Sequence, residues 1–174
     1  MTPHPHLKCL DHEIAEAIAG LSSGQLSARP FNKWSIGEIL EHLYLTYTGT
    51  TKGLSRILEA GKPQSNIPSL KQKLQAFAVV RLGYFPEGRE SPSQARPKGL
   101  AVEEVLGEMS SKIAEMDNVM ASCERRFGAG ANVLDHPILG PFSISQWRKF
   151  HLVHGRHHIK QIKRLRQDSR IQLK

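Results

Sequence analysis

The chain has 174 residues and a mass of 19.5 kDa, which is enough for one domain with a hydrophobic core. Its 39% hydrophobic and 23% charged residues exclude a disordered protein, while its net charge of +8 raises the question of a nucleic-acid partner. No apolar run approaches the roughly 20 residues that cross a bilayer, and the first residues do not resemble a secretory signal, so we expect no membrane partner.

The first predicted helix covers about Leu7–Leu21, where apolar residues recur on one face. Residue types that bind metals cluster near its start, at His4, His6, Cys9 and His12. The prolines at positions 3 and 5 favour a mobile arm here rather than a site. Cys9 and Cys123 are the only cysteines, and their wide separation in sequence indicates neither a CxxC pair nor a disulfide framework, so we expect a reducing, cytoplasmic location.

The second predicted helix follows a connection rich in Ser, Gly and Pro, "SSGQLSARPFNK". Ser35 with Glu38 three residues later indicates a capping box at its start, and Gly61 with Pro63 beyond marks its end. His42 lies on the rim of the apolar stripe of this helix. Helical periodicity therefore permits an inward-facing His42 but does not require it, and a half-exposed polar residue fits the angle as well.

The middle of the chain is less regular. A short helix is expected over about Ser69–Leu82, and "PEGRESPSQARPKGL" at 86–100, with three prolines and two glycines, predicts an extended surface loop. A third long helix covers about Val102–Arg126. After a break at "GAGANVLDHPILGPFS", the last helix runs from Ser145 to about Gln167. No set of alternating strand patterns is present, so the sequence predicts an all-α fold.

Four histidines lie in the last helix, within "FHLVHGRHHIKQI". With about 100° per residue and Trp147 as the origin, its apolar face includes Phe150, His151, His154, His158, Gln161, Ile162 and Leu165. His157 falls toward the edge of this face. The sequence therefore places His154 and His158 in the middle of a buried stripe, one turn apart, rather than on a solvated basic face.

Two imidazoles four residues apart on one helix can bind the same divalent metal. Gly155 stands where the helical motif of zinc proteases has a glutamate, which excludes that class. A buried, hydrogen-bonded core histidine is the ordinary alternative for each ring. A metal site also needs a third ligand from another helix, for which His42 is the candidate, and His151 could replace His154 in the pair.

The connection before the last helix contains His136, followed by Pro137. This histidine either lines the pocket and contacts substrate or only fixes the turn. Trp34 and Trp147 are interpreted as packing residues.

The cations that produce the net charge crowd the end of the chain, at Lys160, Lys163, Arg164, Arg166, Arg170 and Lys174. Cations at a helix C-terminus complement the helix dipole. No aromatic residues alternate with them, and no nucleic-acid motif is recognisable, which argues against a nucleic-acid partner.

Two stretches, "WSIGEILEHL" at 34–43 and "HLVHGRHHIKQ" at 151–161, resemble the DinB-like superfamily of four-helix-bundle metalloproteins. The longer stretch 136–162 resembles its DinB_2/DUF1569 branch in particular. The resemblance covers nearly the whole chain and implies one DinB/YfiT-like domain over 1–174, with a basic tail from about 168. It implies an antiparallel four-helix bundle with one long crossover loop through the proline-rich middle.

The same resemblance implies that His42, His154 and His158 bind a divalent metal, nickel or zinc. In the family a Gly-Gln pair often follows the second histidine by one residue. Here Lys160 replaces the glycine, while Gln161 remains as a residue that can position His158 or line the pocket. The resemblance assigns no protein side chain as the catalytic group, which would be a metal-bound water or thiol.

Three neutral imidazoles leave a coordination position open, as in catalytic rather than structural sites. Resemblance to the family implies a small-molecule substrate and two reaction types: transfer or isomerisation with a low-molecular-weight thiol, or metal-dependent hydrolysis. The alternative from another class is a non-catalytic, metal-stabilised bundle or a weak nucleic-acid-binding protein. The sequence does not decide between a monomer and a homodimer.

Overall fold

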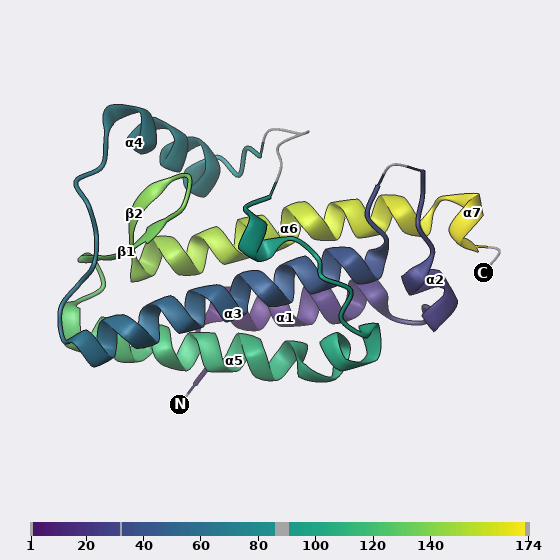
Figure 1. Ribbon diagram of the computed structural model, residues 1–174, viewed down its shortest axis with the longest axis horizontal. Coiled ribbons are helices and arrows are strands. Elements are labelled where there is room, and N and C mark those ends of the chain that lie inside the picture. The colour runs from purple at the N-terminus through teal and green to yellow at the C-terminus, as the bar shows by residue number, and fades with distance from the viewer. Residues whose placement is uncertain (1, 32, 86–90, 173–174) are drawn as a thin grey trace.

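The computed structural model describes residues 2–31, 33–85 and 91–172, and it is mostly helical. Four long helices lie side by side (Figure 1): α1 (Pro5–Ile18), α3 (Ile36–Ala60), α5 (Val102–Phe127) and α6 (Ile144–Arg166). Three short helices complete the fold, α2 (Ser23–Ser27), α4 (Leu70–Ala76) and α7 (Ser169–Gln172), together with the helical turns η1 (Phe77–Arg81) and η2 (Ser93–Ala95). In the described part of the chain, no helix is both long enough and apolar enough to cross a membrane.

Local capping sets the ends of α3 as the sequence predicted. The backbone N–H of Glu38 donates to Ser35 Oγ at 3.1 Å, and the Glu38 carboxylate accepts from the Ser35 N–H at 2.8 Å. At the other end, Gly61 has a φ of 72°, a left-handed conformation that a glycine adopts without strain. The bounds predicted for the third long helix also match α5 to within one residue.

The prediction of a mobile N-terminal arm is wrong. Pro5 is the first residue of α1, where its fixed φ suits a helix, and the His4 side chain accepts from the His6 N–H. The His4 N–H donates to Asp117 on α5 at 2.7 Å, so a buried carboxylate anchors this end of the chain. Among the described residues, the histidines and the cysteine of this segment form no group that could share a metal.

The long helices pair in two parallel couples, whereas the prediction was an antiparallel bundle with one long crossover. Tyr44 of α3 donates to Glu108 of α5, and Arg126 near the end of α5 donates to the Leu58 carbonyl near the end of α3. In the same way, α1 and α6 run in one direction. The antiparallel neighbours are α3 with α6 and α1 with α5. The long crossover between α3 and α5 returns the chain to the same end and so permits the parallel pairing (Figure 1).

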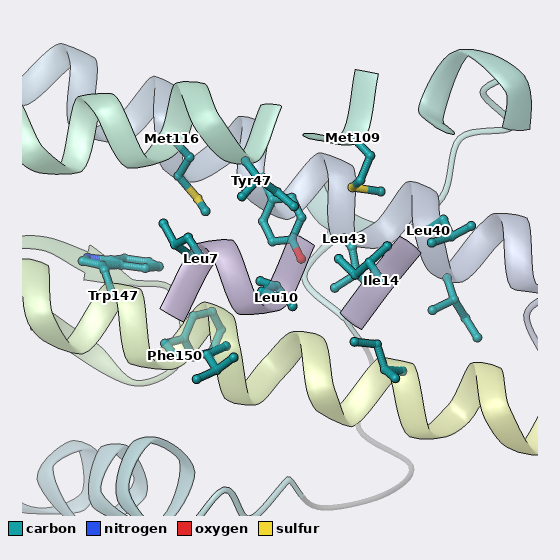
Figure 2. Packing of buried hydrophobic residues seen from close by; sticks show 14 of the residues in the cluster. Leu7, Leu10, Ile14, Leu40, Leu43, Tyr47, Met109, Met116, Trp147 and Phe150 are labelled. Atoms are coloured by element: carbon teal, nitrogen blue, oxygen red, sulfur yellow. The ribbon is translucent and has the colours of Figure 1, made fainter. Parts of the chain in front are cut away.

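Side chains from all four long helices meet in one core (Figure 2), including Leu7, Leu10, Ile14, Leu40, Leu43, Tyr47, Met109, Met116, Trp147 and Phe150. Gly155 of α6 lies close to Leu10 of α1. A Cβ atom there would lie 2.2 Å from Leu10 Cδ1, so any side chain at this position would have to displace the buried Leu10.

A β-hairpin interrupts the expected all-α fold between α5 and α6. Strands β1 (Asn132–His136) and β2 (Gly140–Ser143) pair antiparallel, and α6 begins directly after them at Ile144, one residue earlier than predicted, with a capping box at Ser143. Neither strand shows the alternation of buried and exposed residues that reveals a strand in a sequence, since all four residues of β2 are buried.

The crossover contains the helix predicted at Ser69–Leu82, which the structure divides into α4 and the wider turn η1. The loop predicted at 86–100 is wrong in part: residues 86–90 lie outside the described residues, but the remainder includes η2 and is anchored to α3. The tail expected from about 168 contains α7, where Ile171 is buried. Lys174 and the side chain of Arg170 lie outside the described part.

Candidate metal centre

Three histidines from two helices meet at the contact between α3 and α6. Because these helices are antiparallel, His42 near the start of α3 lies level with the second half of α6. Its Nε2 lies 3.3 Å from His154 Nε2, and His158 Nε2 lies 3.1 Å from the same atom. All three side chains are buried, with exposed fractions of 3% for His42, 8% for His154 and 7% for His158. One ligand atom from each ring lies within 4.8 Å of the others, so the cluster can bind a divalent metal.

Hydrogen bonds on the far side of two rings orient them. His42 Nδ1 lies 2.7 Å from the Ala95 carbonyl, which can only accept, so Nδ1 carries the proton. His158 Nδ1 lies 2.8 Å from Gln161 Oε1, and the amide nitrogen of Gln161 lies 3.2 Å from His157 Nε2. In this arrangement His158 also carries its proton on Nδ1. Both neutral rings therefore direct an unprotonated Nε2 at His154.

The donor set fits a cation. Two nitrogens bound to one tetrahedral zinc at about 2.0–2.1 Å lie about 3.3 Å apart, close to the two separations observed. Without an ion, a single proton on His154 Nε2 can serve only one of the two N···N contacts, so the other contact has no proton to donate. His154 Nδ1 is buried and has no hydrogen-bond partner among the described residues, so within them the orientation of this ring depends on packing and on what its Nε2 binds.

The electrostatics favour neutral imidazoles, the form that binds metals. Burial lowers the pKa of His158 to about 3 and also lowers the pKa of His42. The pKa of His154 lies well below its usual value, first because of burial and then because of the neighbouring His158 and His42 rings. The three rings therefore stay uncharged at neutral pH.

Aromatic rings and one backbone segment surround the cluster. Phe150 stacks on His154 with ring centres 5.2 Å apart, Phe85 lies 5.6 Å from the same ring, and Trp34 lies 5.3 Å from His42. These rings limit the access of water and lower the local dielectric constant. Trp34, predicted to be a packing residue, thus packs directly on a candidate ligand.

The backbone segment, residues 91–99, is called the strap here. The buried carboxylate of Glu41, next to His42 on α3, accepts from the N–H groups of Lys98 and Gly99 at 2.6 and 3.1 Å. The strap is therefore anchored to α3 at two places: Glu41 binds it at residues 98 and 99, and His42 binds it at Ala95. The Ala95 carbonyl in turn orients the ring of His42.

His151 shares the buried face of α6 but does not join the cluster. Its ring is fully buried, stacks on Trp147 at 5.7 Å and contacts Tyr47 at 5.4 Å. Neither ring nitrogen has a hydrogen-bond partner in the described part of the chain, and burial lowers the pKa of His151 to about 3. The exchange of His151 for His154 as a ligand does not fit this geometry.

His136 fixes a turn. Its Nδ1 accepts from the N–H groups of Ile138 and Leu139 at 3.2 and 3.1 Å, which closes the hairpin between β1 and β2. Its ring packs 4.7 Å from Phe150, so one aromatic ring separates it from His154. Burial lowers its pKa to about 4. Of the two interpretations of His136, these contacts favour the structural one.

Sequence reasoning identified His42, His154, His158 and Gln161, and the structure brings these four together. It did not identify Glu41, His157 or the Ala95 carbonyl. In the helical projection His157 lies at the edge of the apolar face, and a projection does not reveal that its ring contacts the Gln161 side chain. The partners of Glu41 and His42 lie more than 50 residues away in a segment predicted to be a surface loop.

Comparison with known proteins identifies a family for this chain. Residues 8–162 match the family model DinB_2, described as the DinB superfamily, and this range includes the three histidines, the strap and all four long helices except the ends of α1 and α6. Searches of curated proteins and of solved structures found no match. Together, the family match and the histidine cluster suggest a metal-binding protein. Because the match covers most of the chain, the protein belongs to the DinB superfamily.

Proposed function

We propose that this protein is a divalent-metal-dependent enzyme that acts on a small molecule, with His42, His154 and His158 as the metal ligands. The observation that carries the proposal is the convergence of three buried Nε2 atoms, separated by 3.1 and 3.3 Å at the two close contacts, with two rings oriented by hydrogen bonds at Nδ1. Three neutral ligands leave an open coordination position, which supports a catalytic rather than a structural role.

A divalent ion held by these three histidines would supply Lewis acidity, which would lower the pKa of a water or thiol and polarise a substrate carbonyl. The remaining roles belong to this chain. The Ala95 carbonyl and Gln161 hold the ligand rings in one tautomer, and Trp34, Phe85 and Phe150 exclude water from the ring side of the site.

The finer features of the proposal follow from the family. We propose the DUF1569 branch, a four-helix bundle formed by α1, α3, α5 and α6, and nickel or zinc as the metal. A transferase or isomerase that uses a low-molecular-weight thiol is placed slightly ahead of a hydrolase. Cys9 and Cys123 are free thiols, which supports a reducing cytoplasm. The proposal is compatible with a monomer and with a homodimer.

The first experiment measures metal binding directly. Protein stripped with a chelator is titrated calorimetrically with Ni²⁺ and with Zn²⁺, beside the variants His158→Ala and His12→Ala. We expect one ion per chain for the wild type and for His12→Ala, whose exposed ring lies on α1, and a large loss for His158→Ala. Absence of binding to the wild type, or equal binding by His158→Ala, would contradict the site.

The second experiment tests the reaction class. The metal-loaded protein is assayed with small thiols and electrophilic acceptors, and separately with esters and amides without thiol. Turnover that needs both a thiol and His158 supports the transferase. Turnover without thiol supports the hydrolase.

A metal-stabilised protein without catalysis is the second candidate, because the cluster lies inside the helix packing rather than on the surface. A large fall in melting temperature on chelation, together with no turnover in either assay, would favour it. Nucleic-acid binding is not proposed, since two of the cations on α6, Arg156 and Arg166, are bound to Glu13 and to the Ala17 carbonyl.

A further inference from the structure

The crossover carries an apolar surface that the four long helices do not cover. Six large hydrophobic side chains between residues 67 and 84 have exposed fractions of 55–94%: Ile67, Leu70, Leu74, Phe77, Leu82 and Tyr84. Elsewhere in the described chain, such residues are scattered singly, at Phe31, Leu100 and Ile138. Single exposed hydrophobic residues are common on protein surfaces, whereas a contiguous set of them indicates an interaction surface.

Three of the six form one line, called the outer stripe here: Leu70, Leu74 and Phe77. With about 100° per residue they fall within about 60° of each other on α4 and the first residue of η1. The opposite side of this segment meets the protein, because Val79 and Val80 are buried and Gln72 lies against Gly140 of β2. Leu70 and Leu74 therefore point away from the body of the protein, on a helix that lies beyond the β-hairpin (Figure 1). Phe77 is also exposed, but it borders a hollow that Leu139 and Pro141 of the hairpin segment line as well.

Cations lie on both sides of the outer stripe. Lys71 and Lys73 flank it at about +100° and about −60° from Leu70 on the same projection, and both are exposed. Residues 60–85 contain no aspartate or glutamate but include Lys62 and Arg81 as well. The nearby Asp135 of β1 accepts from the backbone N–H and the side-chain amide of Asn66, at one end of the segment. The surface around the stripe is therefore apolar at its centre and positive at its borders.

We propose that the segment 67–84 docks on the surface of an anionic lipid bilayer. An apolar line flanked by lysines on both sides fits a lipid interface, because the leucine and phenylalanine side chains enter the acyl boundary while the lysines reach back to the phosphates. A second copy of the chain fits less well, since two such surfaces facing each other bring Lys71 and Lys73 close to like charges.

The sequence predicted no membrane partner because it has no spanning segment or secretory signal, and the proposal departs from that prediction, since an interfacial helix needs only one apolar face and a cationic border. The proposal does not depend on the metal centre or on its reaction. A chain that loses the metal ligand His158 is expected to dock as well as the wild type.

The test is cosedimentation with vesicles of phosphatidylcholine alone and of phosphatidylcholine mixed with the anionic lipid phosphatidylglycerol, at low and high salt. We expect binding to the anionic vesicles that weakens as salt rises. The variant Lys71→Gln/Lys73→Gln should bind the anionic vesicles about thirtyfold more weakly than the wild type, because each lysine near the surface strengthens binding by roughly fivefold. The control Lys8→Gln/Lys52→Gln changes two exposed lysines elsewhere and should bind as the wild type does.

The apolar part of the contact is tested by Leu70→Gln/Leu74→Gln against Phe31→Gln, which also changes a highly exposed apolar residue. The first variant should lose at least about tenfold in partition and the second should lose little. Both should keep the circular dichroism of the wild type, because these side chains are exposed.

Two results would overturn the proposal. One is wild-type protein that stays in the supernatant with both kinds of vesicle at low salt. The other is self-association in analytical ultracentrifugation that disappears in Leu70→Gln/Leu74→Gln, which would assign the outer stripe to a second copy of the chain.

Discussion

His158 and Gln161 lie one turn apart on α6, and their contact of 2.8 Å between Nδ1 and Oε1 determines which nitrogen of His158 faces the other two histidines. Gln161 is itself oriented by His157, because its amide nitrogen contacts the Nε2 atom of that ring. The candidate metal centre is thus supported by a row of side chains on a single helix, and the order of donors and acceptors in this row allows His158 Nε2 to bind a cation.

Replacement of Gln161 by leucine should weaken metal binding by about 10–100-fold, because the acceptor for His158 Nδ1 is lost while the packing volume is kept. Isothermal titration of chelator-treated protein with Ni²⁺ or Zn²⁺ measures the change. The variant Gln161→Glu keeps an oxygen acceptor and should bind more tightly than Gln161→Leu. Equal affinities for both variants and the wild type would show that this hydrogen bond does not orient the ligand.

Replacement of His158 by alanine should abolish the stabilisation that a metal gives, while the protein stays folded. Trp147, Phe150 and Ile162 still pack α6 against the core, so we expect the metal-free stability to change by no more than about 2 kcal/mol. In the wild type, an ion at a thousandfold excess over its Kd adds about 4 kcal/mol. Thermal melting with chelator and with added Ni²⁺ or Zn²⁺ checks both statements. A variant that shifts with metal as the wild type does would exclude His158 as a ligand.

The metal-free protein should lose stability as the pH falls below about 6.5. Burial lowers the pKa of His136 to about 4 and that of His151 to about 3, while an unfolded histidine titrates near 6.5. Between these values the unfolded chain binds protons that the folded chain does not, so acid favours unfolding by about 1.4 kcal/mol per pH unit for each such histidine. Urea denaturation at pH values from 7 down to about 4 measures the slope.

The variant His151→Phe isolates one of these groups. It keeps the ring among Trp147, Phe150 and Tyr47 and removes two buried nitrogens without partners, so the unfolding free energy at pH 7 should stay equal or rise. The slope in acid should fall by about 1.4 kcal/mol per pH unit. A clear loss of stability at pH 7 would mean that the nitrogens of His151 have a partner, such as an internal water.

Replacement of Glu41 by alanine should loosen the strap. Two backbone N–H groups, those of Lys98 and Gly99, lose their acceptor, and we expect a cost of about 1–2 kcal/mol in unfolding free energy. Hydrogen exchange should become faster at these two amides, and metal affinity should fall because the Ala95 carbonyl no longer orients His42 as firmly. Glu59→Ala, at an exposed position on the same helix, is the control and should change neither measurement.

Much of this protein follows from local chemistry that can be seen in the sequence. A capping box needs only Ser35 and Glu38, and the end of α3 needs only Gly61, because the groups that satisfy each helix end lie within a few residues of it. The shared face of His154 and His158 follows in the same way from the helical period. The resemblance to the DinB family rested on these local stretches, and the family match over 8–162 confirmed it.

Other features were decided by contacts between distant segments. His42 stood on the rim of its helix in projection, and only the packing of α3 on α6, with the Ala95 carbonyl 53 residues further along the chain, makes it a buried ring that faces His154. The parallel pairing of α3 with α5, the anchoring of the strap by Glu41 and the β-hairpin closed by His136 have the same origin. Local patterns predict which side of a helix is apolar, but the direction of a borderline side chain depends on which neighbour covers it, and that neighbour is chosen when the whole chain packs.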